Sequence, residues 1–95
     1  MIYREPVELA YNKGLHCAAF KQYEQAVCHF SEAIRLRGGH ADAYYQRALM
    51  FCRLERDAEA FEDLRESIRL HRIASLQALY RRRLIEKLAE LKKAA

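Results

Sequence analysis

Apolar and small side chains recur at helical spacing in two stretches before Gly38. Pro6 suits the first turn of a helix, and residues at intervals of three and four follow it: Val7, Ala10, Tyr11, Gly14, Leu15, Cys17 and Ala18. A second stretch has the same period: Ala26, Val27, Phe30, Ala33, Ile34 and Leu36. It stops at Gly38-Gly39, because glycine readily adopts the left-handed conformation that ends a helix. The pattern predicts two helices separated by a break at residues 20–23.

The same two patterns return 34 positions later in the chain. Several residues recur at this interval: Glu32, Ile34, Arg35, Leu36 and Arg47 reappear as Glu66, Ile68, Arg69, Leu70 and Arg81. Small residues also match, with Gly14 opposite Ala48 and Ala26 opposite Ala60. Two helices can approach closely only where their side chains are small, so these positions indicate contacts between paired helices. The repeat predicts four helices in two hairpins, with a polar break at residues 55–57 in the second.

The chain is expected to be a single domain, because it has only 95 residues. We place the first repeat at 7–40, the second at 41–74 and a final helix at 75–95. The final helix has an apolar stripe made of Leu76, Tyr80, Leu84, Leu88 and Leu91. A stack of hairpins leaves its last apolar face uncovered unless another element packs on it. We therefore expect this helix to cap the second hairpin.

Composition favours an all-α fold. The chain has one proline, three glycines and no tryptophan, and it is rich in residues that favour helix over strand. Its three cysteines are odd in number and lack close pairing, which argues against a disulfide framework and for a reducing compartment. The first residues carry charges and contain no long apolar run, so neither a signal peptide nor a membrane span is expected. The expected localisation is cytoplasmic, with the nucleus as the alternative.

Together these features resemble the tetratricopeptide repeat, a 34-residue helix-turn-helix unit with a small residue midway in its first helix and an A-x3-F-x2-A run in its second. That run reads Ala26, Phe30, Ala33 in the first repeat and Ala60, Leu64, Ser67 in the second. The usual tryptophan and leucine of the first helix are replaced by Ala10 and Lys13, then by Tyr44 and Arg47. The resemblance covers residues 7–74. It implies an α-solenoid of two hairpins with a C-terminal capping helix.

The resemblance also implies a function. In tetratricopeptide arrays the first helix of each hairpin lines a concave groove that binds a peptide or helix of a partner protein. The residues expected in that groove are Tyr11, Leu15, Tyr45, Gln46, Leu49, Leu76, Leu79, Tyr80 and Arg83. An apolar hollow edged with a few polar groups has the composition of a binding site. We therefore expect a non-catalytic scaffold, although the last helix could instead fold over the groove and bury it.

The sequence lacks motifs for catalysis, metal or cofactor binding. Gly38-Gly39 follows a helix and lacks the Lys-Ser/Thr partner of a phosphate loop. His16-Cys17 and Cys28-His29 are adjacent pairs, and only one member of each pair can point toward a shared metal ion. We expect no enzyme activity, no metal site and no cofactor.

The net charge of +4 is concentrated in residues 72–95, which hold seven Lys or Arg against Glu86 and Glu90. Residues one helical turn apart, such as Arg82 and Glu86, are expected to pair in a solvated mixed-charge face. Aromatic stacking partners are scarce there, which argues against nucleic acid as a partner.

Two further questions concern protein partners. Tetratricopeptide domains that bind chaperones hold a C-terminal carboxylate with a charged clamp. The corresponding positions here are Tyr11, Leu15, Gln46, Leu76 and Tyr80, which cannot neutralise a carboxylate, so a chaperone tail is not expected. A second strip of Ala78, Ile85 and Ala89 leaves a homodimer open as an alternative. A further alternative is that the chain is a fragment of a longer scaffold.

Overall fold

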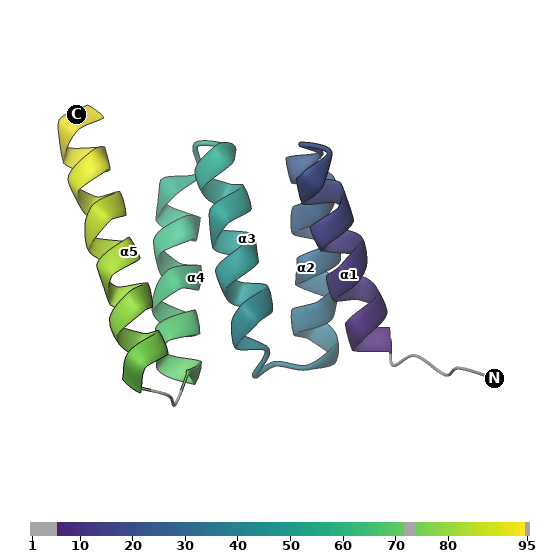
Figure 1. The fold of residues 1–95 in the computed structure, drawn as a ribbon. Coiled ribbons are helices and arrows are strands. Elements are labelled where there is room, and N and C mark those ends of the chain that lie inside the picture. The colour runs from purple at the N-terminus through teal and green to yellow at the C-terminus, as the bar shows by residue number, and fades with distance from the viewer. Residues whose placement is uncertain (1–5, 72–73, 95) are drawn as a thin grey trace.

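The computed structural model describes residues 6–71 and 74–94, which form five α-helices and no strand. The helices are α1 (Pro6–Ala19), α2 (Tyr23–Leu36), α3 (Ala41–Arg53), α4 (Asp57–Leu70) and α5 (Ala74–Ala94). Each helix packs against the one before it in the chain, and together they form a row (Figure 1). The all-α fold expected from the sequence is confirmed. None of the described helices combines the length and apolar character needed to cross a membrane.

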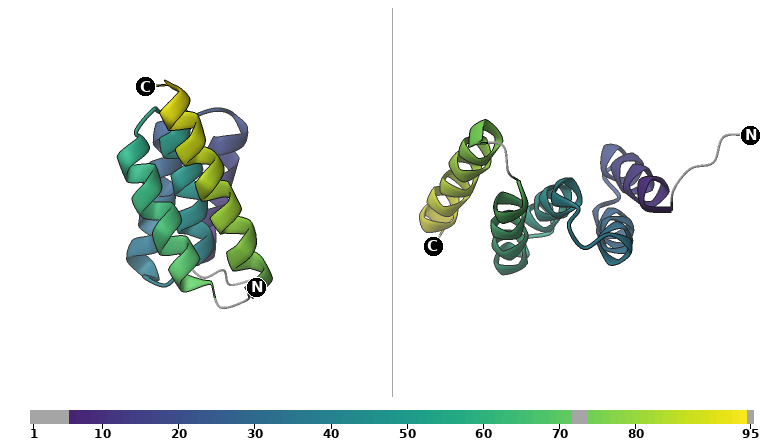
Figure 2. Two further views of the ribbon diagram at one scale, coloured as in Figure 1. Left: turned by 90° about the vertical axis from the view of Figure 1, so that its left-hand side faces the viewer. Right: turned by 90° about the horizontal axis from the view of Figure 1, so that it is seen from below.

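The helices alternate between two layers when they are seen nearly end-on (Figure 2, right). Helices α1, α3 and α5 form the first layer, and α2 and α4 form the second. This alternation follows from hairpins that are joined in series, because each turn returns the chain to the opposite layer. The first layer therefore gathers the helices on which the sequence placed the binding residues.

The turns inside the two hairpins have the same geometry. In the first hairpin the amides of Lys21 and Gln22 donate to carbonyls of α1 at 3.1 and 2.8 Å. In the second hairpin the amides of Glu55 and Arg56 donate to carbonyls of α3 at the same two distances. Lys21 and Glu55 both have φ of 61°, a left-handed conformation that residues other than glycine seldom adopt. One tight turn thus occurs twice, 34 residues apart.

Small residues allow the two helices of the first hairpin to approach each other closely. A Cβ atom at Gly14 would lie only 2.5 Å from the ring of Phe30, so glycine fits here without displacing the ring. Phe30 is fully buried, and its ring has little room to move. The equivalent pair in the second hairpin is Ala48 and Leu64, both of which are buried. In the second hairpin the small residue is thus alanine instead of glycine, and the large residue is leucine instead of phenylalanine.

The apolar core of the described structure extends across the boundary between α2 and α3. One cluster joins four buried residues of the first three helices: Cys17, Ala26, Phe30 and Met50. A second cluster consists of Ala10, Ala33 and Ala43. Both clusters contain residues from α1, α2 and α3, so continuous apolar packing holds the second hairpin to the first.

A partly buried ion pair reinforces the second hairpin. The guanidinium group of Arg47 on α3 donates to both carboxylate oxygens of Asp63 on α4, at 2.7 and 2.8 Å. It also donates to the hydroxyl oxygen of Ser31 on α2 at 3.1 Å. The hydrogen bonds to Asp63 raise the pKa of Arg47, which keeps the guanidinium charged. Arg47 therefore links three helices.

Helix α5 covers the end of the second hairpin, but not with the whole stripe that the sequence predicted. Leu84 and Lys87 are half-buried. Leu88, which was expected in the buried stripe, is 44% exposed, so this part of the prediction is wrong. The helix is rotated about its axis so that Lys87, instead of Leu88, faces the hairpin. The side chains of Leu76, Tyr80 and Leu91 lie outside the described residues.

Candidate partner-binding surface

The predicted binding residues whose side chains are described all lie in the first layer. Tyr11 and Leu15 are on α1, whereas Tyr45, Gln46 and Leu49 are on α3, and Leu79 and Arg83 are on α5. Leu15 and Leu79 are 37% and 43% exposed, and the three residues of α3 are half-buried. The predicted side chains of Leu76 and Tyr80 are outside the described residues, so their roles stay predictions.

Helix α5 extends the first layer beyond α3 and does not fold across α1 (Figures 1 and 2). Its main contact with the predicted surface is at Tyr45. The guanidinium carbon of Arg83 lies 5.9 Å from the centroid of the Tyr45 ring, within the range of a cation–π contact. The structure thus brings Tyr45, Leu49 and Arg83 together.

A slot separates α5 from the second hairpin, and we call it the α5 slot. It has a volume of about 220 Å³. Tyr45 and Leu49 of α3 and Leu64 of α4 form its apolar side. Its opposite side is charged and consists of residues from α5: Arg83, Glu86, Lys87 and Glu90. The slot therefore combines aliphatic and aromatic walls with charges of both signs.

A smaller cavity of about 70 Å³ shares Leu64, Lys87 and Glu90 with the α5 slot. It reaches Cys52, Asp57, Ala60 and Phe61 on the second hairpin. The Lys87 ammonium pairs with the Glu90 carboxylate at 3.2 Å, one helical turn away. Lys87 is half-buried and Glu90 is exposed, and both side chains border the two cavities.

Burial controls the protonation of the groups around these cavities. It raises the pKa of the Tyr45 hydroxyl, although the nearby charge of Arg83 acts in the opposite direction. Burial likewise raises the pKa of the Cys52 thiol. At neutral pH both groups are therefore protonated, and Cys52 is not activated as a nucleophile. The surface presents hydrogen-bond donors, aliphatic groups and fixed charges, which is chemistry suited to binding.

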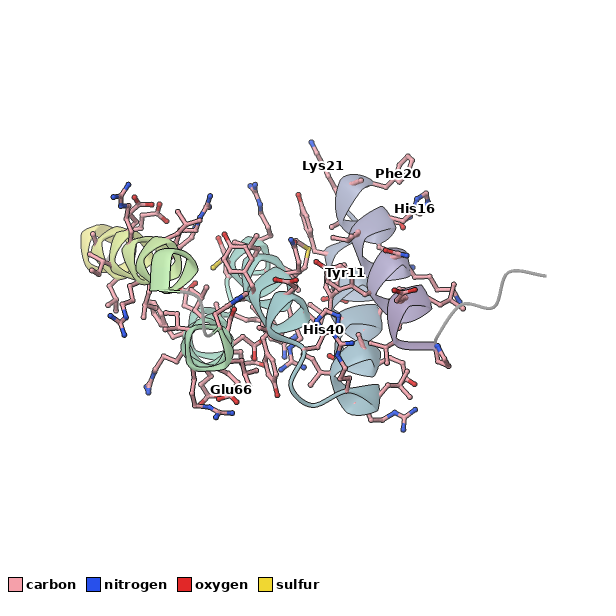
Figure 3. The ribbon with its side chains drawn as sticks, turned by 60° about the horizontal axis from the view of Figure 1, so that its bottom comes forward. Tyr11, His16, Phe20, Lys21, His40 and Glu66 are labelled. Atoms are coloured by element: carbon pink, nitrogen blue, oxygen red, sulfur yellow. The ribbon has the colours of Figure 1, made fainter. Side chains whose placement is uncertain are left out.

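Tyr11 makes packing contacts in addition to its predicted place in the groove. Its ring centroid lies 5.7 Å from that of Phe30 and 4.8 Å from that of His40 (Figure 3). His40 precedes α3 and caps it, because its Nδ1 accepts a hydrogen bond from the amide of Ala43 at 3.1 Å. Burial lowers the pKa of His40, which favours the neutral ring that this bond requires. Tyr11 thus helps to hold α1 to the start of α3.

The histidine and cysteine pairs that the sequence singled out are not arranged as a ligand set. Cys17 is buried, whereas Cys28 is exposed. Among the residues that the structure describes, no three His, Cys, Asp or Glu side chains gather in a way that could hold a metal ion.

Comparison with models of known protein families gives no match for this chain, and no curated protein matches it significantly. The resemblance to the tetratricopeptide repeat therefore stays a prediction from the sequence.

Proposed function

We propose that the chain is a tetratricopeptide-type domain, an α-solenoid of two hairpins with a final capping helix. Support comes from the two turns with the same hydrogen bonds and the same left-handed residue, 34 positions apart. The matched small residues Gly14 and Ala48, and the alternation of helices between two layers, also support it. The repeat boundaries remain those expected from the sequence, at 7–40, 41–74 and 75–95.

The proposed function is non-catalytic binding of a peptide or helix of a partner protein along the first layer. The observation that carries this proposal is the α5 slot, which opens beside half-exposed apolar side chains of that layer. Its volume of about 220 Å³ is several times the roughly 30 Å³ that a water molecule occupies, so one aliphatic side chain of a partner has room to enter. Tyr45 and Leu49 would contact that side chain, and Arg83 and Lys87 would meet polar groups beside it.

This arrangement has the general anatomy of a protein–protein contact. Burial of an apolar anchor supplies most of the affinity, and charges at the rim set orientation and discriminate between partners. The described positions that a chaperone-type carboxylate clamp would use, Tyr11, Leu15 and Gln46, carry no cationic side chain. The proposed partner is therefore an internal segment with apolar side chains and not a chain end.

The proposal can be tested with peptides selected from a random library for binding to the full chain. Changing Leu15→Asp or Leu79→Asp should weaken the selected peptides at least tenfold, which corresponds to about 1.4 kcal/mol or more. Both leucines are exposed enough that helicity, measured by circular dichroism, should be unchanged. Calorimetric titration measures the affinities.

Leu36→Asp is the matched control. Leu36 is 38% exposed, close to the value for Leu15, but it lies on α2 in the second layer. The control variant should bind the peptides as the unmodified chain does. Peptides that tolerate both first-layer changes, or that respond to Leu36→Asp as strongly, would refute the proposed groove.

A further inference from the structure

Helix α5 corresponds, position by position, to the first helix of each hairpin. Adding 34 residues leads from Gly14 to Ala48 and then to Arg82, and from Cys17 to Phe51 and then to Ile85. On α1 and α3 these positions are buried, because α2 and α4 pack over them. On α5 both are exposed, and Ile85 keeps 64% of its surface accessible. No helix of the described chain covers this side of α5, which lies at the end of the row (Figure 1).

This side of the helix forms a continuous surface, which we call the outer face of α5. Its described members follow one another at helical spacing: Arg81, Arg82, Ile85, Leu88 and Ala89. Leu88 is 44% exposed, and both arginines and Ala89 are exposed as well. The outer face is therefore an apolar strip with cationic groups along it.

The two described carboxylates of α5, Glu86 and Glu90, line the α5 slot, although both are exposed and Glu86 lies one helical turn from Arg82. The expected pairing of Arg82 with Glu86 is not observed, and no ion pair joins Arg81 or Arg82 to any carboxylate of the described residues. The positive charge on the outer face is thus not neutralised within the described chain.

We propose that the outer face of α5 is a second docking surface, separate from the groove, which binds an acidic amphipathic helix of a partner protein. Ile85 and Leu88 would pack against the apolar stripe of that helix. Arg81 and Arg82 would pair with its flanking carboxylates, in the bidentate geometry that guanidinium groups favour. This proposal does not depend on the proposed function of the first layer.

Arg82 determines how a helix can approach this face. Within the first hairpin the close contact of the helices depends on the absence of a side chain at Gly14, where even a Cβ would lie 2.5 Å from Phe30. The long side chain of Arg82 prevents an equally close contact on α5. A helix docked here must lie farther away, and at that distance a glutamate side chain can reach the guanidinium group.

A second copy of this chain fits the outer face poorly. Two outer faces packed together would bring Arg81 and Arg82 of both copies into one interface, where these arginines outnumber the one carboxylate beside them, Glu86.

A membrane surface fits poorly for a different reason. Helices that lie in a lipid interface expose a broad apolar face, usually with aromatic residues. The described outer face has two large aliphatic side chains, Ile85 and Leu88, and no aromatic one. It is wide enough to contact one helix.

The test uses the full chain and two synthetic amphipathic peptides of about 20 residues, long enough to form a helix. Both peptides have the same leucine stripe, which is flanked by glutamates in one and by lysines in the other. The acidic peptide should bind at least tenfold more tightly than the basic one. The double change Arg81→Glu, Arg82→Glu should reverse this preference, and Ile85→Asp should weaken binding of the acidic peptide at least tenfold.

Two control variants separate this surface from other sites. Arg65→Glu alters an exposed arginine on α4, and Leu79→Asp damages the proposed groove; neither should change binding of the acidic peptide. Conversely, Ile85→Asp should leave peptides selected for the groove unaffected. A negative result for the outer face of α5 can thus be distinguished from a negative result for the proposed groove.

Several results would overturn the proposal. These are equal affinity for the two peptides, no measurable binding of the acidic peptide, and a preference that survives the double arginine change. Sedimentation that shows a dimer lost on Ile85→Asp would assign the face to a second copy. Binding to phosphatidylserine vesicles that is lost with the same variant would assign it to a membrane.

Discussion

The second hairpin has one neighbour on each side, and its two boundaries are packed in opposite ways. Toward α2 the boundary is apolar and filled, with Phe30, Met50 and Ala33 buried. Toward α5 the boundary contains the charged pair Lys87 and Glu90, beside one open slot and one small cavity.

This difference arises from side chains and not from the helical backbone. The position held by Leu15 on α1 and Leu49 on α3 is Arg83 on α5, and Arg83 lines the α5 slot. Helix α5 therefore carries a charged side chain at this boundary where α1 and α3 carry leucine. The open slot lies beside that charged side chain.

The largest expected effect distinguishes equivalent core positions in the two hairpins. Phe30→Ala should lower the free energy of unfolding by about 3–5 kcal/mol, because the fully buried ring leaves a large cavity. Leu64→Ala should cost about 2–3 kcal/mol, at the low end for leucine, because Leu64 already borders two cavities. Urea unfolding of the two variants measures both values. A larger loss for Leu64→Ala would mean that the boundary with α5 is the tighter one.

A second comparison uses the position of Gly14. Gly14→Ala should destabilise the chain by about 1–3 kcal/mol, because the added Cβ overlaps the buried ring of Phe30. The clash outweighs the roughly 1 kcal/mol that alanine gains over glycine in helix propensity. Arg82→Ala, at the equivalent place on α5, should change stability by less than about 0.5 kcal/mol. Thermal unfolding of the two variants provides the measurement, and a stabilised Gly14→Ala chain would contradict the close contact.

The loose boundary should be possible to tighten. Lys87→Leu would place an aliphatic group against Leu64 and the small cavity, and should stabilise the docking of α5 by about 0.5–1.5 kcal/mol. Amide hydrogen exchange should show slower exchange in α5, with α1 and α2 unchanged. Arg65→Leu, an apolar replacement at an exposed position of α4, is the control and should not slow exchange in α5. Unchanged exchange in the Lys87→Leu chain would mean that α5 is not held through this face.

The smallest expected effect is a pH dependence at the tight boundary. Burial lowers the pKa of His40 in the folded chain below its unfolded value near 6.5. The unfolded state therefore binds the proton more readily, so the contribution of His40 to stability is full above pH 6.5 and declines as the pH falls toward the lowered folded value. His40→Asn retains a good capping residue and should lose less stability between pH 7 and pH 5. Equal losses in the two chains would show that protonation of His40 does not limit stability.

The sequence predicted the helices well, because the period of small and apolar residues and the break at Gly38 are local signals. It could not indicate the left-handed turns at Lys21 and Glu55, since neither residue is a glycine. Nor could it determine the rotation of α5. Leu84 can be buried together with either Leu88 or Lys87, and contacts with α4 decide between the two.

The sequence indicated which helices carry the candidate site, but it did not indicate the shape of that site. The resemblance to the tetratricopeptide repeat, and not helical spacing, led us to expect Tyr45, Leu49 and Arg83 on the same side of the molecule. The α5 slot depends on the separation between α5 and α3, which no local pattern encodes. The contact of Tyr11 with His40 likewise joins residues far apart in the sequence, and it became visible only in the folded chain.

Contacts between helices join almost entirely neighbours along the chain, and this has a consequence for folding kinetics. A chain that need not bring distant segments together closes only short loops, and such chains fold rapidly. The same arrangement allows the chain to unfold in steps, since one end can detach while the remaining helices stay packed. We expect α5, which has the fewest contacts with the helix before it, to detach first and to rejoin the folded hairpins many times before they unfold.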